Sequence, residues 1–296
     1  MPNITANGIQ IEYDTFGEKS GRPILLIIGI GAQLTLWSEE FCQQLVNSGH
    51  YVICFDNRDT GLSTKIEEAG IPNLMEAMNK VMRREKLEAS YTYDDMADDA
   101  VGLLDALGIE KAHICGMSMG GAIAQTIAIN HPSRVLSLIP IFGPTGNSKL
   151  PQPKPEILGL LMTPPPVERE PFIEQTMNLF RAFAGSGYEL EESWLRDYTE
   201  KGYDRAFYPQ GMARQFLAGL AHGSRSRRLK TVTAPTFVIH GDEDPIVAVE
   251  NGRDAAECIP GAELMIIKGM GHDMPYRGAW GQIAEAIAEH TRKVEV

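Results

Sequence analysis

The first part of the chain alternates between two patterns of hydrophobic and polar positions. Short apolar runs rich in β-branched residues, such as residues 23–28, are typical of strands covered on both faces. Longer stretches with apolar residues three or four positions apart, such as residues 93–107, are typical of helices that pack through one face. The two patterns predict strands at residues 9–13, 23–28, 51–55, 112–115, 134–142, 236–240 and 263–267, and helices at residues 36–47, 93–107, 118–130, 247–258 and 280–290. Strands that alternate with helices predict an α/β fold, in which a mostly parallel sheet carries helices on both faces.

The alternation is interrupted between residues 144 and 224. Apart from a proline-rich start at residues 151–155, this stretch has helical spacing and no strand pattern. Its predicted helices are residues 172–184, 191–198 and 211–221. An all-helical insert is typical of a lid over the carboxyl edge of the sheet, where α/β proteins bind ligands. We therefore expect an all-helical cap of residues 145–224 inserted into a core of residues 1–144 and 225–296; a structural excursion without a gating role is the alternative.

Composition and charge narrow the classes of function. The chain has 296 residues, 43% of them hydrophobic and 22% charged, which is ordinary for a globular protein with a full core. Acidic residues outnumber basic residues by 39 to 27, which gives a formal net charge of −12. Because such a surface repels phosphate backbones, we expect no nucleic-acid partner.

The N-terminus and the cysteines indicate a cytoplasmic protein. The first residues have neither the basic nor the apolar region of a signal peptide, and the longest apolar stretch, residues 24–32, is too short to span a bilayer. The four cysteines, Cys42, Cys54, Cys115 and Cys258, are scattered and form no CxxC pair. We therefore expect neither a disulfide framework nor a zinc site. Without a tight cluster of histidines, cysteines and carboxylates, we expect no metal.

The strongest motif is Gly116-Met-Ser-Met-Gly120, which fits the pattern G-x-S-x-G. It lies between a predicted buried strand and a helix of small residues, which is the context of a nucleophile elbow. In such an elbow the serine stands on a tight turn, and its hydroxyl projects from the edge of the sheet. The unpaired N–H groups at the start of the following helix face a developing oxyanion. Ser118 is therefore the candidate nucleophile, and an ordinary glycine-rich turn is the alternative.

A serine hydroxyl needs a base before it becomes a good nucleophile. His272 lies in a loop between the last predicted strand and the last predicted helix, at the carboxyl edge of the sheet. The other histidines are less well placed, at the amino ends of strands, in helices, in or beside the cap, or within the turn that presents the acid: His50, His113, His131, His222, His240 and His290. His272 is therefore the candidate base.

The acid of the triad is expected on a loop after a strand, between the serine and the histidine, because sites built on such an elbow follow that order. The segment His240-Gly-Asp-Glu-Asp-Pro245 follows a predicted strand. Asp244 is the preferred candidate, since the residue must reach past the turn to the far nitrogen of the histidine, and Asp242 is the second. Asp273 is a further alternative, although adjacent residues rarely face each other.

The loop Gly29-Ile-Gly-Ala32 follows an early predicted strand and supplies the other half of an oxyanion hole. We expect the backbone N–H groups of Ile30 and of Met119, the residue after the serine, to be the two donors. Backbone donors leave the identity of the side chains free. The same stretch mimics a dinucleotide fingerprint, with Asp56 at the end of the next strand, but the third glycine is missing and no helix begins at the loop.

Together these residues resemble those of an α/β-hydrolase over essentially the whole chain. The resemblance rests on the elbow at Ser118, on Asp56-Asn-Arg-Asp-Thr-Gly-Leu-Ser63, on residues 240–245 and on Gly271-His272. Residues 56–63 are similar to the D-x-R-G-x-G-x-S loop of that superfamily, with Asp59 where glycine is usual.

Within the superfamily, the sequence looks most like the serine esterases of the aclacinomycin methylesterase group. Residues 28–37 are similar to the oxyanion loop of that group. Ile28 stands where histidine is usual elsewhere in the superfamily. Serine in the elbow argues against dehalogenases and epoxide hydrolases, which carry aspartate there. The resemblance implies an α/β-hydrolase fold with about eight mostly parallel strands, a helical lid and no cofactor.

Residues and resemblance together predict a serine hydrolase that cleaves a carboxylic ester through an acyl-enzyme. Apolar residues near the active edge, with Trp37, Phe142 and Met274 as the pocket candidates, favour an uncharged, largely apolar small-molecule substrate. The same triad also suits perhydrolysis, acyl transfer or C–C bond hydrolysis. A ligand receptor without turnover is the alternative from another class. The sequence leaves the natural substrate and the oligomeric state open.

Overall fold

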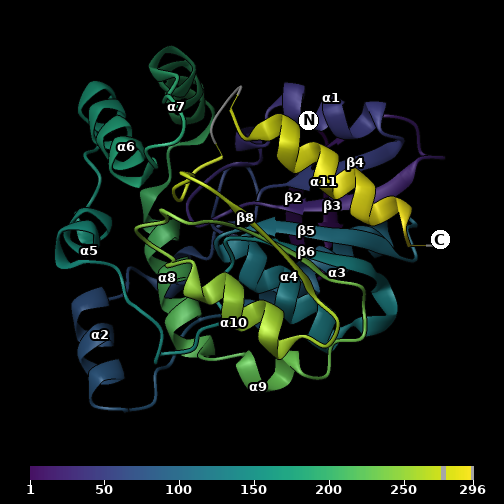
Figure 1. The fold of residues 1–296 in the computed structure, drawn as a ribbon. Helices are drawn as coiled ribbons and strands as arrows, with labels where there is room; N and C mark the ends of the chain where they lie inside the picture. Colours follow the sequence, from purple (N-terminus) through teal and green to yellow (C-terminus); the bar gives the residue numbers. More distant parts are fainter. Residues whose placement is uncertain (275–277, 295–296) are drawn as a thin grey trace.

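One eight-stranded sheet forms the centre of the protein. The computed structural model describes residues 1–274 and 278–294. The strands are β1 (Asn3–Ala6), β2 (Ile9–Phe16), β3 (Arg22–Ile27), β4 (His50–Phe55), β5 (Ala112–Met117), β6 (Val135–Ile141), β7 (Phe237–Gly241) and β8 (Glu263–Ile267). Their order is β1-β2-β4-β3-β5-β6-β7-β8 (Figure 1). The pairs β1–β2 and β2–β4 are antiparallel and the other neighbours are parallel, so the predicted mostly parallel sheet is confirmed.

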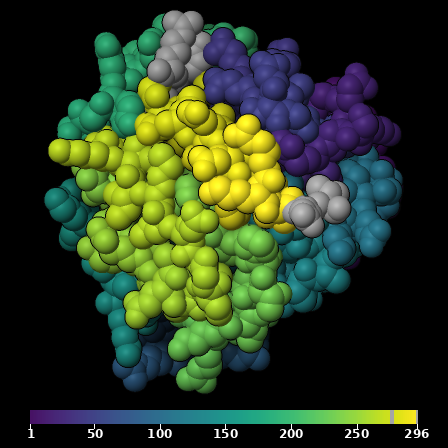
Figure 2. Space-filling model, turned by 45° about the vertical axis from the view of Figure 1, so that its right-hand side comes forward, coloured from purple at the N-terminus to yellow at the C-terminus, as the bar shows by residue number. Residues whose placement is uncertain are grey.

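Helices cover both faces of this sheet. The described residues form α1 (Glu39–Asn47), α2 (Leu74–Met82), α3 (Tyr93–Ala106), α4 (Met119–Asn130), α5 (Pro155–Met162), α6 (Arg169–Phe183), α7 (Glu192–Ala206), α8 (Pro209–His222), α9 (Ser226–Leu229), α10 (Glu250–Cys258) and α11 (Trp280–Arg292). α1 and α11 pack on one face, and α3 and α4 pack on the other (Figure 1). Figure 2 shows the C-terminal part of the chain, in yellow, beside the N-terminal segments, in purple. None of the helices formed by the described residues has the length and apolar character needed to cross a bilayer.

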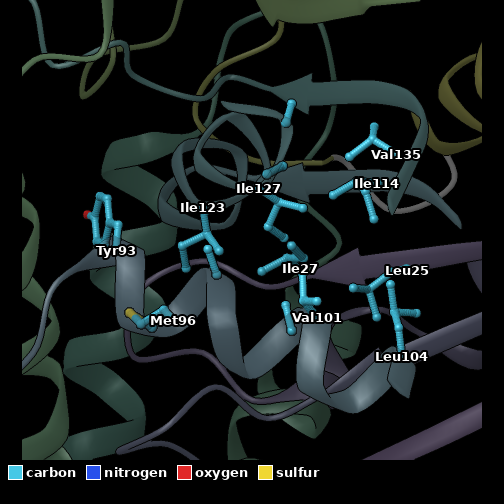
Figure 3. Close-up of a cluster of buried hydrophobic side chains, with 14 of the residues drawn as sticks. Leu25, Ile27, Tyr93, Met96, Val101, Leu104, Ile114, Ile123, Ile127 and Val135 are labelled. Atoms are coloured by element: carbon cyan, nitrogen blue, oxygen red, sulfur yellow. The ribbon is translucent and has the colours of Figure 1, made fainter. Parts of the chain in front are cut away.

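The central strand β3 is buried on both faces, as its continuous apolar run predicts. Leu25 and Ile27 pack in the cluster beneath α3 and α4, and Figure 3 shows them with Ile123 and Ile127 of α4. The alternate residues of β3, which include Ile24, pack against α1 and α11. Each fully buried leucine or isoleucine side chain stabilises the fold by about 1.5–3 kcal/mol. Both layers therefore fix the carboxyl end of β3, from which a functional loop extends.

Local chemistry explains where the observed elements depart from the predicted ones. The Ser38 side chain accepts a hydrogen bond from Phe41 N–H at 3.1 Å, so α1 begins at Glu39 and the preceding residues form a separate 3-10 turn, Leu34–Leu36. The sequence patterns also miss β1, α2 and α5. These elements have 4, 9 and 8 residues, and such short segments contain few repeats of a periodic pattern.

Between β6 and β7 the described residues form helices and no strand of the sheet, as the sequence predicts. Residues 145–224, called the cap segment below, contain α5, α6, α7 and α8, which lie beside the sheet on the left of Figure 1. Arg225 ties together the two connections between the cap segment and the sheet. Its backbone N–H donates to Thr145 O at 2.8 Å, and its Nη2 donates to Pro144 O at 2.6 Å. The two ends of the cap segment therefore meet at Arg225, and this meeting point is called the neck below.

A buried ion pair joins the cap segment to the core. Arg214 of α8 donates two hydrogen bonds of 2.8 Å to the Asp59 carboxylate, which also accepts from the Tyr91 hydroxyl and from Ile66 N–H. Burial acts to raise the pKa of Asp59, but these hydrogen bonds hold it below its ordinary value. The φ of Asp59 is +67°, a left-handed value that favours glycine and that aspartate tolerates. Aspartate at this position thus gives the loop a binding group for α8.

We expect Arg214→Met to lower the free energy of unfolding by about 3 kcal/mol, because the Asp59 carboxylate then stays buried without its cation. Equilibrium urea unfolding at neutral pH measures this change. Arg227→Met, at an exposed arginine of α9, is the matched control and should shift the value by no more than about 0.5 kcal/mol. Equal losses in the two variants would show that the ion pair does not hold the cap segment.

Candidate active site

Ser118 stands on the tight turn between β5 and α4, with φ 54° and ψ −120°. This backbone conformation is strained for a residue that carries a Cβ. Close packing maintains it, since a Cβ on Gly116 would lie 2.2 Å from Gly120 O, and a Cβ on Gly120 would lie 2.1 Å from Ile27 O. Ser118 N–H also donates to Ile141 O at 3.0 Å. The two glycines of the motif therefore allow β3, β5 and α4 to meet beneath the serine.

Ser118, His272 and Asp244 form a continuous chain of hydrogen bonds. Ser118 Oγ lies 2.9 Å from His272 Nε2, and His272 Nδ1 lies 2.6 Å from Asp244 Oδ2. The three residues follow β5, β8 and β7, whose carboxyl ends meet at the same edge of the sheet. Asp242, the second candidate for the acid, instead accepts from Gly269 N–H at 2.6 Å. The structure thus brings together the three residues that the sequence favours.

The Asp244 carboxylate is buried and held on both of its oxygens. Oδ1 accepts from Ile246 N–H at 2.9 Å and from Val247 N–H at 2.8 Å, which leaves Oδ2 to His272. His240 Nε2 lies 3.5 Å from the same Oδ2. Burial alone would raise the pKa of Asp244, but the charges of His272 and His240 and the hydrogen bond from His272 hold it well below its ordinary value. A carboxylate that stays ionised stabilises an imidazolium on His272.

The loop after β3 reaches Ser118 through Gly29. A Cβ on Gly29 would lie 3.5 Å from Ser118 Cβ and 4.0 Å from Ser118 Oγ. Its neighbour Ile30, and Met119 at the start of α4, line the cavity on which the serine opens. Within the described chain, the backbone N–H groups of Ile30 and Met119 have no hydrogen-bond acceptor. Both donors are therefore available to an oxygen of a ligand.

Ser118 and His272 open into a cavity of about 430 Å³. Loops at the carboxyl edge of the sheet form one wall, and the helices of the cap segment form the other. The aromatic lining residues are Tyr93, Phe142, Phe172, Phe180, Phe183, Trp194, Tyr198, Tyr203, Phe207, Tyr208, Phe216 and Trp280. The lining residues that the structure describes include no lysine and no arginine, whereas Glu191 and Asp273 contribute carboxyl groups. The described lining is therefore rich in aromatic residues. It includes two acidic residues and neither lysine nor arginine.

Two of the three predicted pocket residues line this cavity. The ring of Phe142 lies 4.7 Å from that of His272, and Met274 forms another part of the wall. Trp37 lies elsewhere: its side chain is 2% exposed and stacks on Phe41 at 5.5 Å in the cluster between the sheet and α1. The 3-10 turn before Trp37 directs it into this core. The expectation for Trp37 is corrected accordingly.

Sequence reasoning missed the residues that the cap segment contributes. Its aromatic residues are spread over separate helices, where their spacing is the same as that of an ordinary core face. The glutamine Gln215 of α8, which contacts the loop after β3, gives no sequence signal of its own. Asp59 does give a sequence signal, because a charged residue in place of the usual glycine indicates a specific partner side chain.

The described residues offer no evident place for a metal ion. Among them, no three side chains of histidine, cysteine, aspartate or glutamate gather into a potential metal site. The four cysteines are free thiols, and Cys42, Cys54 and Cys115 are buried.

Comparison with known proteins identifies the family. The family model for the alpha/beta hydrolase fold matches residues 22–279. The chain is 29% identical to the rhodomycin D methylesterase DnrP of Streptomyces peucetius, over 99% of this chain and 98% of that protein. It is 28% identical to the 2-hydroxy-6-oxononadienedioate/2-hydroxy-6-oxononatrienedioate hydrolase of Cupriavidus pinatubonensis, over 84% of this chain and 80% of that protein. The predicted resemblance to a methylesterase group is confirmed.

A solved structure has the same fold. The meta-cleavage product hydrolase of Pseudomonas fluorescens IP01 matches with a TM-score of 0.74, at 22% identity, over 99% of this chain and 98% of that chain. At this level of identity the likeness concerns the fold alone. The family match and the order of the sheet agree, and the chain belongs to the α/β-hydrolase fold family.

Proposed function

We propose that this chain hydrolyses a carboxylic ester of an uncharged, largely apolar substrate through an acyl-enzyme at Ser118. The activity class is that of the methylesterase DnrP, which the chain matches over nearly its full length. The observation that carries the proposal is the hydrogen-bonded chain from Asp244 through His272 to Ser118, which opens into an aromatic cavity.

In the proposed mechanism, Ser118 Oγ attacks the ester carbonyl while His272 Nε2 accepts the hydroxyl proton. Asp244 holds the ring of His272 and stabilises the imidazolium. The N–H groups of Ile30 and Met119 bind the oxyanion. When the C–O bond breaks, His272 returns the proton to the departing alcohol. Water then attacks the acyl-enzyme and gives a proton to His272, which passes it to Ser118 Oγ as the bond to the acyl group breaks and the carboxylic acid leaves.

The cavity supports a large acyl group and a small alcohol. At about 430 Å³, its volume falls within the range of sites that enclose small molecules. DnrP is named as a methylesterase, and the alcohol that leaves a methyl ester is methanol, so most of such a substrate is its acyl part. We extend this arrangement to the present chain. The aromatic walls favour a flat, apolar ring system, since aromatic pairs gain about 0.5–1.5 kcal/mol beyond their buried area.

The cap segment, residues 145–224, is part of the proposal as the cover of this site. This role is supported by the lining residues, because α6, α7 and α8 carry most of the aromatic side chains of the cavity. A cover that excludes water strengthens the electrostatic interactions inside the site. The neck at Arg225 keeps this cover attached beside the carboxyl edge of the sheet.

The charges of the cavity support an uncharged substrate over a dicarboxylate. The dioate substrates named for the Cupriavidus hydrolase carry two carboxylates. The lining residues in the described chain include no lysine or arginine to bind such groups. Asp273 lines the cavity, its side chain is 8% exposed, and its Oδ1 has no partner in the described chain. Burial raises the pKa of Asp273 to about 6, although the charge of His272 opposes the rise. Above that pH the carboxylate repels an anionic ligand.

We expect Ser118→Ala to lose about 10⁴-fold or more in the rate of hydrolysis of p-nitrophenyl esters, because the acyl-enzyme is then not formed. A series of esters from acetate to decanoate, followed by the absorbance of the released p-nitrophenolate, measures the rate. The acyl length that is hydrolysed fastest also indicates the size of the cavity. Labelling of the wild type, but not of the variant, by a fluorophosphonate is the control. Equally slow hydrolysis by the wild type and by Ser118→Ala, together with no labelling of the wild type, would contradict the hydrolase and favour a ligand receptor.

We expect p-nitrophenyl hexanoate to be hydrolysed with a kcat/KM about tenfold or more above that of the p-nitrophenyl monoester of adipic acid. The two acyl chains have the same length, and only the second ends in a carboxylate, whose desolvation beside acidic walls is unfavourable. Asp273→Asn should narrow this ratio at pH 8 (about 2 units above the raised pKa). A preference for the adipate would contradict the proposed uncharged substrate.

The raised pKa of Asp273 also predicts a dependence of stability on pH. The folded protein binds this proton more tightly than the unfolded chain, so the contribution of Asp273 to stability falls as the pH rises through about 6. Relative to the wild type, Asp273→Asn should therefore gain about 2 kcal/mol in the free energy of unfolding between about pH 4 and about pH 8. Urea unfolding at the two values measures the gain. Glu257→Gln, at an exposed residue of α10, is the control for the effect of net charge; an equal gain in both variants would contradict the prediction.

A further inference from the structure

Gln215, on α8 of the cap segment, is fully buried against the loop after β3. Its Oε1 accepts a hydrogen bond from Gly31 N–H at 2.8 Å. Its Nε2 donates to Arg58 O at 2.8 Å and to Thr60 Oγ1 at 2.7 Å. One side chain of the cap segment thus connects the loops that follow the neighbouring strands β3 and β4.

The partners of Gln215 determine the orientation of its amide. Gly31 N–H only donates and Arg58 O only accepts, so Oε1 faces Gly31 and Nε2 faces Arg58. The side chain is 0% exposed, which leaves no solvent to replace these bonds. Breaking one of them leaves a buried polar group without a partner, at a cost of about 1–3 kcal/mol. The amide is therefore held in a single arrangement.

The bond from Gly31 stabilises a turn at residues 29–32. Gly31 has a φ of +66°, Ile30 has no positive φ, and Ala32 N–H donates to Gly29 O at 3.4 Å. A turn with a left-handed residue at its third position alone is of type II. Its own closing hydrogen bond is long, and the bond from Gly31 to Gln215 is the shorter of the two. Gln215 therefore opposes rotation of the peptide between Ile30 and Gly31 to the type I orientation.

The same turn presents the N–H of Ile30. Gly29 O and Ile30 N–H belong to one planar trans peptide and point in opposite directions. Because Gly29 O faces Ala32 N–H, the N–H of Ile30 points out of the turn. A Cβ on Gly29 would contact Ser118, so this donor lies near the serine. Gln215 anchors the adjacent Gly31, so a shift of Gly31 after the loss of Gln215 would move the turn that carries this donor.

We propose that Gln215 is a positioning residue, which holds the turn at residues 29–32 in the geometry that binds the tetrahedral intermediate. The proposal rests on the oxyanion hole of the proposed function. α8 is a firm support for this bond, because Arg214 is paired with Asp59 and a Cβ on Gly211 would lie 1.8 Å from Asp59 O. The cap segment thereby contributes to stabilisation of the oxyanion through a residue that acts on the backbone of the loop.

Gln215→Met preserves the approximate length of the side chain and removes all three hydrogen bonds. We expect kcat on a neutral p-nitrophenyl ester to fall about 10–100-fold while KM changes less than about threefold, because the donor acts mainly in the transition state. Phenylboronic acid, which forms a tetrahedral adduct with a catalytic serine, should bind about tenfold more weakly. Gln210→Met, the same substitution at an exposed position of α8, is the matched control and should leave both values unchanged.

Gln215→Glu separates positioning from packing, and it keeps the proposal testable if the methionine variant does not fold. A buried neutral glutamic acid accepts from Gly31 N–H with its carbonyl oxygen and donates its hydroxyl to Arg58 O. We expect it to keep kcat within about tenfold of the wild type and to bind the boronic acid more tightly than the methionine variant. The proposal is overturned if the two variants lose kcat equally, or if the affinity of Gln215→Met for the boronic acid is unchanged. If only the glutamate variant folds, a loss of kcat greater than about tenfold overturns it.

Ser118→Ala distinguishes the two levels of the argument. Activity that survives Ser118→Ala overturns the proposed function. Activity that is lost in Ser118→Ala and intact in Gln215→Met overturns the role of Gln215 alone.

Discussion

The close approach of three backbones beneath Ser118 is the constraint on which the site depends. No Cβ fits at Gly116, where β5 meets α4, or at Gly120, where α4 meets β3. This approach holds Ser118 at a φ of 54°, a strain of about 1–3 kcal/mol that the buried layers on either side of the sheet offset. It also brings the start of α4 and the loop after β3 to the same point. The serine hydroxyl and the N–H groups of Met119 and Ile30 therefore gather through one packing arrangement.

The loop after β4 connects this arrangement to the cap segment. Asp56 accepts from Arg205 of α7 at 2.8 Å, and Asp59 accepts from Arg214 of α8 at the same distance. Both carboxylates are buried, and a buried ion pair stabilises only when its geometry and its remaining hydrogen bonds are complete. Asp56 meets this condition through Leu34 N–H and Leu62 N–H. Two acidic residues on one loop thus determine where two helices of the cap segment lie.

The sequence is most informative where a local pattern of residues is compatible with only one kind of local structure. The run through β3 has to be a buried strand, and the glycines around Ser118 require an elbow, so the core follows from periodicity and turn chemistry. The cap side depends on pairings between distant residues, such as Asp59 with Arg214, which are 155 positions apart. Periodicity carries no information on such pairs. Trp37 illustrates the limit, because the 3-10 turn Leu34–Leu36 before it directs its ring into the core, whereas the sequence pattern predicts a helix that begins at residue 36.

The hydrogen bonds that hold the cap segment differ from helix to helix. α8 is bound through Arg214 and Gln215, and lifting it would release Gly31 together with the turn beside Ser118. α7 is bound through Arg205 and through the side chain of Gln33, which donates to Gly202 O at 2.7 Å. α5 packs against α6 and takes part in none of these bonds of the described chain. The position of the turn beside Ser118 therefore depends on α8 and not on α5.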